Sequence, residues 1–234
     1  MKKVMISVLL VLIIATASYA AYNVKVSAAS RYKFAEGGFE ADIVTPRVTG
    51  MASKIAQTEL NREFAEDARE LIEEFKEDVA ETKRDMPGET VHIGVKSDFV
   101  IKTNNKNILA FSVYVLETSG SSSPELDFFN IDKRNGKLIE LRSLFKKHSN
   151  YVAVLSKYIR SEMDRINKTN PTTFWKEGDG VDVFKEIDDD HDFYINDKGL
   201  IVICFDKYDV GPGSSGSPEF VIPSGVIKKI AAQY

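Results

Sequence analysis

A long amphipathic segment, residues 53–85, restricts the fold of this 234-residue chain more than any other feature. Its apolar residues recur at the spacing of one helical face, and the Pro87-Gly88 pair just beyond it ends the pattern. The apolar residues on this face are Ile55, Phe64, Ala68, Leu71, Ile72, Phe75 and Val79. The sequence therefore predicts one long helix from about Ser53 to Asp85.

The segments on either side of this helix alternate apolar and polar residues, as strands do. We expect strands at residues 40–46, 91–101, 108–116, 126–131, 137–141, 193–195 and 200–205. A second helix is predicted over residues 151–166 and a short final helix near residues 226–230. Strands interrupted by helices in this order predict an α+β fold, with an antiparallel sheet packed against two main helices.

The first 20 residues have the pattern of an export signal. Two lysines precede an apolar run at residues 4–17, and Ser18 and Ala20 occupy the small-residue positions before a cleavage bond between Ala20 and Ala21. The pattern predicts a cleaved signal peptide or an uncleaved anchor, because residues 4–21 are close to the minimum length of a membrane span. In both cases the remainder is expected to be extracytoplasmic, and either secreted or attached to the membrane by this segment alone.

Residues 21–38 mix small, polar and charged side chains and end in Gly37-Gly38. We expect a linker or stalk there. The predicted organisation is thus a signal peptide or membrane anchor at residues 1–20, a linker at 21–38 and one folded domain at 39–234.

Composition and motifs argue against several classes of function. The chain has 31 Lys and Arg against 35 Asp and Glu, so it lacks the excess of positive charge that nucleic-acid binding requires. The single Cys204 lies in an apolar run, where a buried, inert thiol is expected. The acidic run at residues 188–192 lacks the glycine and terminal glutamate of a calcium-binding EF-hand loop. We predict no catalytic residues, no cofactor and no metal site.

Negative charge is concentrated on the long helix. Between Glu59 and Asp85 there are eleven acidic and five basic residues, a net charge of −6. One interpretation is an ordinary solvated helix face with ion pairs between successive turns. The other is a surface that attracts a basic partner.

A group of C-terminal motifs resembles a known family. The motifs are residues 192–202, 208–213 and 217–223, with further matches at 43–46, 60–61, 130–132, 135–137 and 144–145. Together they are similar to the extracytoplasmic module shared by RsiV-type anti-sigma factors and the N-terminal region of PdaC-type peptidoglycan deacetylases. In that family the deacetylase activity belongs to a separate domain and the anti-sigma activity to a cytoplasmic segment, so the resemblance carries neither activity to this chain.

The resemblance implies a non-catalytic binding or sensor module. Its expected partner is a C-type lysozyme or another basic protein of the cell envelope. The alternative is a module that binds wall glycan or peptidoglycan, with Phe174, Trp175 and Tyr208 stacking on sugars.

Two loops rich in small residues and proline, residues 119–124 and 210–218, are the expected partner-binding surface. Each follows a strand that we assign to the same sheet, so we expect both at one end of it. Plain connecting loops would have a similar composition, and that alternative stays open. The candidate partner-binding residues are Ser121, Ser122, Tyr208, Pro212, Gly213 and Ser214.

Overall fold

The computed structural model describes residues 22–89, 91–118 and 123–232. The predicted export segment with its cleavage bond between Ala20 and Ala21 lies outside these residues, and so do Ser121 and Ser122. Within the described ranges, no helix combines the length and the apolar character that crossing a bilayer requires.

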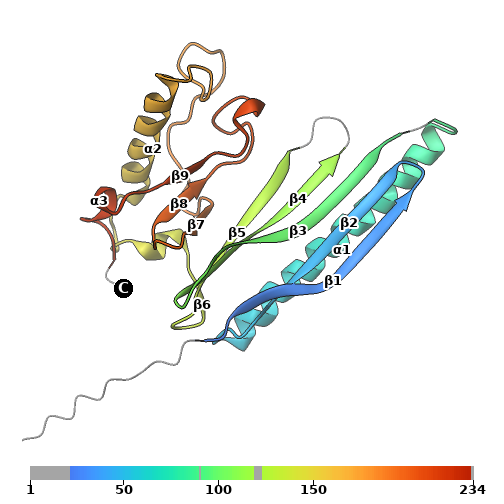
Figure 1. Ribbon diagram of the computed structural model, residues 1–234, viewed down its shortest axis with the longest axis horizontal. Helices are drawn as coiled ribbons and strands as arrows, with labels where there is room; N and C mark the ends of the chain where they lie inside the picture. Colours follow the sequence, from blue (N-terminus) through green and yellow to red (C-terminus); the bar gives the residue numbers. More distant parts are fainter. Residues whose placement is uncertain (1–21, 90, 119–122, 233–234) are drawn as a thin grey trace, which may run out of the picture.

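The N-terminal part of the chain forms a large sheet with one long helix against it (Figure 1). The strands occur in chain order: β1 (Lys25–Glu36), β2 (Phe39–Thr49), β3 (Ile93–Asn104), β4 (Ile108–Thr118), β5 (Pro124–Asp132) and β6 (Lys137–Leu138). Neighbouring strands are antiparallel except β2 and β3, which are parallel because the helix α1 (Lys54–Asp85) connects them.

The C-terminal part forms a second lobe around a small sheet, in the order β7-β8-β9. Its elements are the short helix η1 (Leu141–Leu144), α2 (Tyr151–Asn167), β7 (Phe193–Ile195), β8 (Ile201–Cys204), η2 (Gly213–Ser215), β9 (Glu219–Val221) and α3 (Ser224–Ile227). The α+β prediction with two main helices is confirmed. The strand β9 was not predicted, because its three residues lie between Pro218 and Pro223 and follow a loop rich in glycine and serine.

The long helix begins and ends where its sequence predicts. The Ser53 hydroxyl caps the first turn by accepting a hydrogen bond from the Ala56 N–H at 3.2 Å, and the helix ends at Asp85. Its buried residues are Leu60, Phe64, Ala68, Phe75 and Val79. Ile55, which the sequence placed on the same face, is 73% exposed because it lies in the first turn beyond the edge of the sheet contact.

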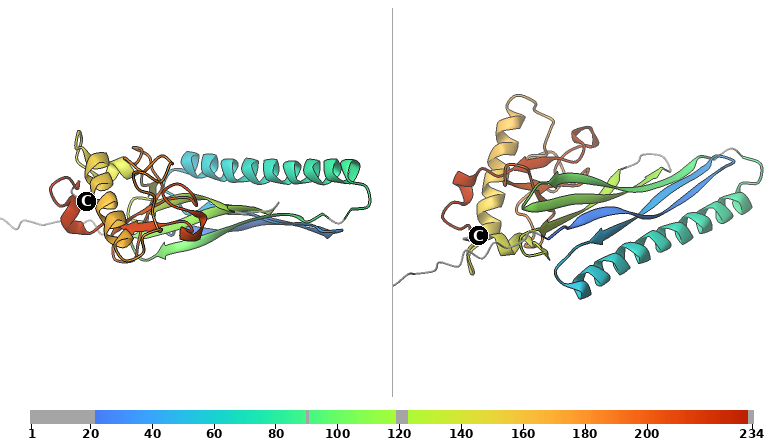
Figure 2. Two further views of the ribbon diagram at one scale, coloured as in Figure 1. Left: turned by 90° about the horizontal axis from the view of Figure 1, so that it is seen from above. Right: turned by 60° about the horizontal axis from the view of Figure 1, so that its bottom comes forward.

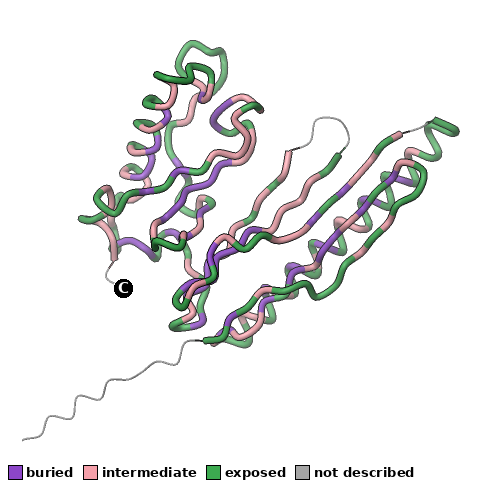
Figure 3. Tube along the Cα trace, viewed as in Figure 1, coloured by how far each residue is buried: buried purple, intermediate pink, exposed green. Residues whose placement is uncertain are grey.

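The helix crosses the large sheet obliquely. Its N-terminal half packs with Phe111 of β4 and Ile131 of β5 through Leu60 and Phe64, while its C-terminal half packs with the β1–β3 side of the sheet. All of α1 lies on one side of the sheet (Figure 2), and the buried residues follow this contact (Figure 3). The second lobe packs on the opposite side, through β4 residues such as Ala110.

A buried asparagine joins the two lobes. The Asn130 side chain on β5 donates a hydrogen bond to the Phe193 carbonyl at 2.8 Å and accepts one from the Ile195 N–H at 2.9 Å. Asn130 is 1% exposed, so its amide takes the place of a strand partner for β7 in a region that water does not reach.

Two other asparagines use the same arrangement inside each lobe. Asn61 on α1 accepts from the Val48 N–H at 2.7 Å and donates to the Val48 carbonyl at 2.8 Å. Asn167 at the end of α2 makes the equivalent pair with the backbone of Phe174, both at 2.9 Å. These amides fix a helix to the neighbouring backbone at one position each.

The predicted linker at residues 21–38 is wrong over most of its length. Residues 25–36 form β1, which pairs with β2 from end to end. Phe34 packs on Phe75 of α1 with ring centroids 5.7 Å apart, and the Gly37-Gly38 pair, both with positive φ, makes the hairpin turn. Order extends further, since the Tyr22 N–H donates to the Lys133 carbonyl at 2.6 Å.

Candidate functional site

The loop that carries the predicted partner-binding residues is a strained, exposed ridge. We call residues 206–216 the Tyr208 ridge. Tyr208 has φ of +77°, a conformation rare for a bulky side chain, and is 47% exposed. Its ring lies against Gly213, where an added Cβ would come within 2.6 Å of the Tyr208 hydroxyl. Pro212 and Ser214 flank that glycine, so the structure brings these four predicted residues together.

The ridge is held in place by the segment that follows α2. The Ser215 hydroxyl donates to the Thr173 carbonyl at 2.5 Å, and the Trp175 N–H donates to the Val210 carbonyl at 3.0 Å. At Gly211 an added Cβ would lie 2.3 Å from the Thr173 carbonyl oxygen. This close approach gives the loop a fixed shape, unlike a simple flexible connection.

Acidic side chains surround the ridge. Asp192 precedes β7, Asp206 lies in the ridge, and Asp127 lies on β5. Burial raises the pKa of Asp192, and together with the charges of Asp127 and Asp206 it brings this pKa to about 6. Burial also raises the pKa of Asp206 to about 6, with contributions from Asp209 and Glu125. The carboxylates of β5 and of the second lobe therefore lie close enough to repel one another.

This repulsion predicts a pH-dependent gain of stability in Asp192→Asn. A raised pKa means that the folded state binds more protons between pH 3.8 and about 6, so wild-type stability falls as pH rises through that window and stays lowered above it. Removing the charge should stabilise the protein at pH 7.5 by about 1 kcal/mol after discounting for solvent screening, or roughly 3 °C in Tm. The gain should be largely absent at pH 4. Calorimetric melts at both pH values, with the exposed Asp182→Asn as control, test this; equal gains at the two pH values would contradict it.

The predicted placement of the two loops in one sheet is wrong. The loop at residues 119–124 follows β4 of the large sheet, whereas the loop at 210–218 follows β8 of the small sheet. The sequence could not separate the two sheets, because its patterns indicate which residues form strands and do not indicate which strands pair. Ser121 and Ser122 lie outside the described residues, so their part in a shared surface stays a prediction.

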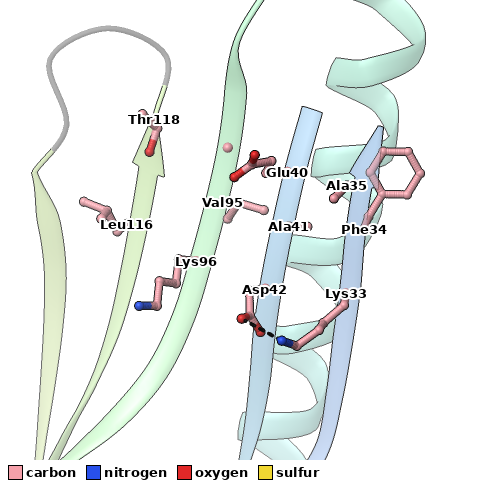
Figure 4. Close-up of a pocket in the computed structure, with 11 residues that line it drawn as sticks. Lys33, Phe34, Ala35, Glu40, Ala41, Asp42, Val95, Lys96, Leu116 and Thr118 are labelled. Carbon is pink, nitrogen blue, oxygen red and sulfur yellow. Dashed lines mark ion pairs between the residues drawn. The ribbon is translucent and has the colours of Figure 1, made fainter. Parts of the chain in front are cut away.

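A shallow groove of about 570 Å³ lies on the side of the large sheet away from α1 (Figure 4). Lys33, Glu40, Asp42 and Lys96 line it, so its charges are balanced. Asp42 is bound by Arg31 at 2.5 Å and Lys33 at 3.4 Å, and the Arg31 guanidinium holds the pKa of this carboxyl at about 2. These ion pairs within the sheet leave the groove without the charge excess found beside the Tyr208 ridge.

The aromatic residues proposed for sugar stacking differ in accessibility. Phe174 is 5% exposed and packs on Phe220 with ring centroids 5.5 Å apart, so it belongs to the core. Trp175 is half-buried and lines a groove of about 670 Å³ with Phe184 and Arg160. Trp175 and Tyr208 are therefore the two of the three that a sugar could reach.

The side chains that could take part in catalysis or bind a metal mostly have structural roles. Cys204 is 3% exposed, and burial raises the pKa of its thiol above the usual value, which keeps it protonated. In the acidic run, Asp189 pairs with Arg142, and its carbonyl accepts a hydrogen bond from the Tyr151 hydroxyl at 2.6 Å. Over residues 22–89, 91–118 and 123–232, no three His, Cys, Asp or Glu side chains are grouped to hold a metal ion.

Comparison with known proteins identifies sequences that are similar to this chain. Residues 142–225 match the family model described as protein of unknown function DUF3298. The chain is 31% identical over 190 residues to the anti-sigma-V factor RsiV of Bacillus subtilis strain 168, a match that covers 81% of this chain and 64% of RsiV. The chain thus spans less than two thirds of the length of that relative.

Solved structures support the fold. A DUF3298 family member from Bacteroides fragilis superposes with a TM-score of 0.64 at 14% identity, covering 91% of this chain and 95% of that one. A DUF3298 protein from Pseudomonas aeruginosa PAO1 gives 0.53 at 13% identity, covering 92% and 96%. At these identities the structures establish the architecture alone, while the sequence match gives the similarity to RsiV over 190 residues. The chain is therefore similar to RsiV over 190 residues, and its C-terminal lobe carries the segment that matches DUF3298.

Proposed function

We propose that this chain is a non-catalytic, extracytoplasmic binding module whose partner is a basic protein of the cell envelope, with C-type lysozyme as the first candidate. The observation that carries the proposal is the Tyr208 ridge, where an exposed aromatic side chain is held in a strained conformation beside repelling carboxylates. Strain of this kind persists where the surrounding structure enforces it, and it is common at binding sites.

The energetics of the ridge favour a cationic ligand. Asp206 is half-buried and Asp192 is exposed, and both are held among like charges at a cost to the free protein. A basic partner would relieve this repulsion, and its approach would be accelerated by the acidic field. Tyr208 supplies the large, rigid apolar contact that usually contributes most at the centre of an interface.

The export of the module is part of the same proposal. Residues 1–20 act as a signal peptide or anchor, which places the domain where an envelope protein can reach it. The name of the Bacillus subtilis relative denotes an anti-sigma factor, a protein that acts by binding another protein. For this chain we propose the binding function of the domain.

Tyr208→Ala tests this proposal directly. We expect the variant to bind C-type lysozyme about 10- to 30-fold more weakly, since loss of a central tyrosine costs roughly 2 kcal/mol. Folding should be largely unaffected, because Tyr208 is 47% exposed. Titration calorimetry of the purified mature protein at moderate salt measures the affinity, with Tyr22→Ala, another exposed tyrosine, as control. Undetectable binding by the wild type, or equal affinity in all three proteins, would refute lysozyme recognition at the ridge.

The second candidate function is glycan or peptidoglycan binding, which the groove beside Trp175 favours. A half-buried aromatic ring next to Arg160 and Asp164 offers both stacking and hydrogen bonding to a sugar. Co-sedimentation with insoluble peptidoglycan distinguishes the two functions: wild-type protein that pellets, with Trp175→Ala left in solution, would favour the glycan.

A further inference from the structure

The long helix covers only part of its side of the large sheet. Six strands about 4.8 Å apart make a sheet roughly 25 Å wide, whereas one helix with its side chains is about 10 Å across. Because α1 runs obliquely, its C-terminal half lies over the β1–β3 side, where Phe75 packs on Phe39 and Ile43. No other described helix lies beside α1 over the ends of β4 and β5 nearest residues 119–122 (Figure 2).

A groove with an apolar floor occupies this uncovered region. We call it the α1–β4 groove; its volume is about 260 Å³. Its floor consists of Val44, Pro46, Phe64, Ala68, Leu71, Val113 and Val115. Val113, Val115 and Leu71 are only half-buried, so a partner that covered them would gain further burial of apolar surface.

The rim of the α1–β4 groove is acidic throughout. The carboxylates that line it are Asp67, Glu70, Glu74, Glu117, Glu125 and Asp127. None of its lining residues is basic, and no ion pair among the described residues involves one of these six. Burial raises the pKa of Asp67, and Asp127 and Glu70 raise it further, which shows that carboxylates face one another across the groove.

Most basic residues of α1 lie on one flank of the helix. Arg62, Arg69, Lys76 and Lys83 recur every seven residues and so form one stripe. Lys76 lies over the Tyr32 ring at 5.9 Å and Lys83 over Phe39 at 5.5 Å, so this stripe faces β1 and β2. The opposite flank, which borders the groove, carries Asp67, Glu70 and Glu74. Glu66 and Glu73 pair with basic residues of that stripe, whereas no basic side chain lines the groove beside the three carboxylates of this flank. This imbalance favours the interpretation of an acidic docking surface.

We propose that the α1–β4 groove binds a basic amphipathic helix of a partner protein. Such a helix would lie beside α1, place its apolar stripe on Val113 and Val115, and direct lysines and arginines toward both acidic rims. It would complete the helical layer over the large sheet at the usual spacing of 8–10 Å between packed helices. The groove lies on the α1 side of the sheet, and the second lobe with the Tyr208 ridge packs on the other. Glu125 and Asp127 on β5 belong to the rim of the groove and also contribute to the acidic surroundings of the ridge, so variants at the other rim residues, Asp67 and Glu74, separate this site from lysozyme recognition.

A designed peptide provides the probe. We would use an 18-residue helix of leucine and lysine with one apolar stripe, and a scrambled peptide of identical composition, both fluorescently labelled. Fluorescence anisotropy titration with the purified mature protein at 150 mM salt should give at least tenfold tighter binding of the amphipathic peptide than of the scrambled one. Equal affinities would reduce the interaction to non-specific charge attraction and overturn the proposal.

Variants locate the binding. The double variant Val113→Thr/Val115→Thr keeps branched strand residues and net charge, and it should weaken amphipathic peptide binding at least fivefold. Asp67→Asn/Glu74→Gln should weaken it about tenfold, whereas Glu73→Gln/Glu77→Gln, which removes the same charge from outside the groove, should change it less than twofold. Equal loss in the two charge variants, or no loss in the threonine variant, would refute the groove as the site.

Hydrogen exchange keeps the test independent of variant folding. In the wild-type protein, the bound peptide should slow amide exchange in residues 113–117 and in the middle of α1 while leaving residues 206–216 unchanged. Protection confined to residues 206–216 would overturn the groove and support the ridge instead. Lysozyme binding can fail without affecting any of these outcomes.

Discussion

Replacing Asn130 with leucine is expected to destabilise the protein by about 3 kcal/mol, although the two side chains are similar in volume. The substitution leaves the Phe193 carbonyl and the Ile195 N–H without partners in a site that water does not reach. Each unsatisfied buried backbone group costs roughly 1–3 kcal/mol. Chemical denaturation should show a midpoint shifted well below that of the wild type.

The matched control for this variant is Asn107→Leu. Asn107 is an exposed asparagine at the turn between β3 and β4, and its replacement should change stability by less than about 0.5 kcal/mol. Because Asn130 joins the lobes, we also expect the second lobe to exchange its amide hydrogens faster in Asn130→Leu. A stability equal to that of the wild type would show that the amide bridge is not needed to hold β7 on β5.

The second large effect is expected from a single methyl group at Gly211. In Gly211→Ala the new Cβ would lie 2.3 Å from the Thr173 carbonyl oxygen and 3.1 Å from the Ser215 hydroxyl. Backbone atoms cannot yield as a flexible side chain can, so the ridge must move away from residues 173–175. We expect a loss of about 2 kcal/mol in stability and a loss of partner binding through displacement of Tyr208.

Gly225→Ala is the control for the ridge variant, because an added Cβ at Gly225 meets no atom within 4 Å. It should melt within about 2 °C of the wild type. Thermal melts measure the loss of stability. Fluorescence quenching or amide hydrogen exchange at Tyr208 reports its displacement. If Gly211→Ala and Gly225→Ala melt together, the close contact with Thr173 does not restrain the ridge.

Long segments with a regular apolar repeat were the most predictive part of the sequence. The helix α1 was predicted with its correct ends because 32 residues of periodicity, a serine cap and a Pro-Gly stop all indicate the same element. The strand β1 was missed because its core contacts are few: of its residues, Val26, Tyr32 and Phe34 pack inward, and the others are exposed. A strand at the edge of a sheet buries few side chains, so its sequence need not alternate between apolar and polar residues.

The candidate site was predicted in part. Tyr208, Pro212, Gly213 and Ser214 are grouped by a local loop, and local sequence was enough to single them out. The carboxylates around them were not, because Asp127 and Asp192 are 65 residues apart and meet only through the docking of one lobe on the other. The family motif at Asn130 could be noticed in the sequence, yet its reason, the bridge to β7, becomes clear only in three dimensions.

The form of β1 also bears on how copies of this protein behave when concentrated. A strand at a sheet edge exposes backbone groups that can recruit a second chain and begin aggregation. In β1 the register shifts between Ala28 and Ser30, opposite Pro46, and Arg31 and Lys33 add positive charge just beyond the irregularity. A flat partner strand cannot follow that bend, and a second copy of β1 would bring like charges close. The outer edge of β1 is thus a poor template for fibril growth.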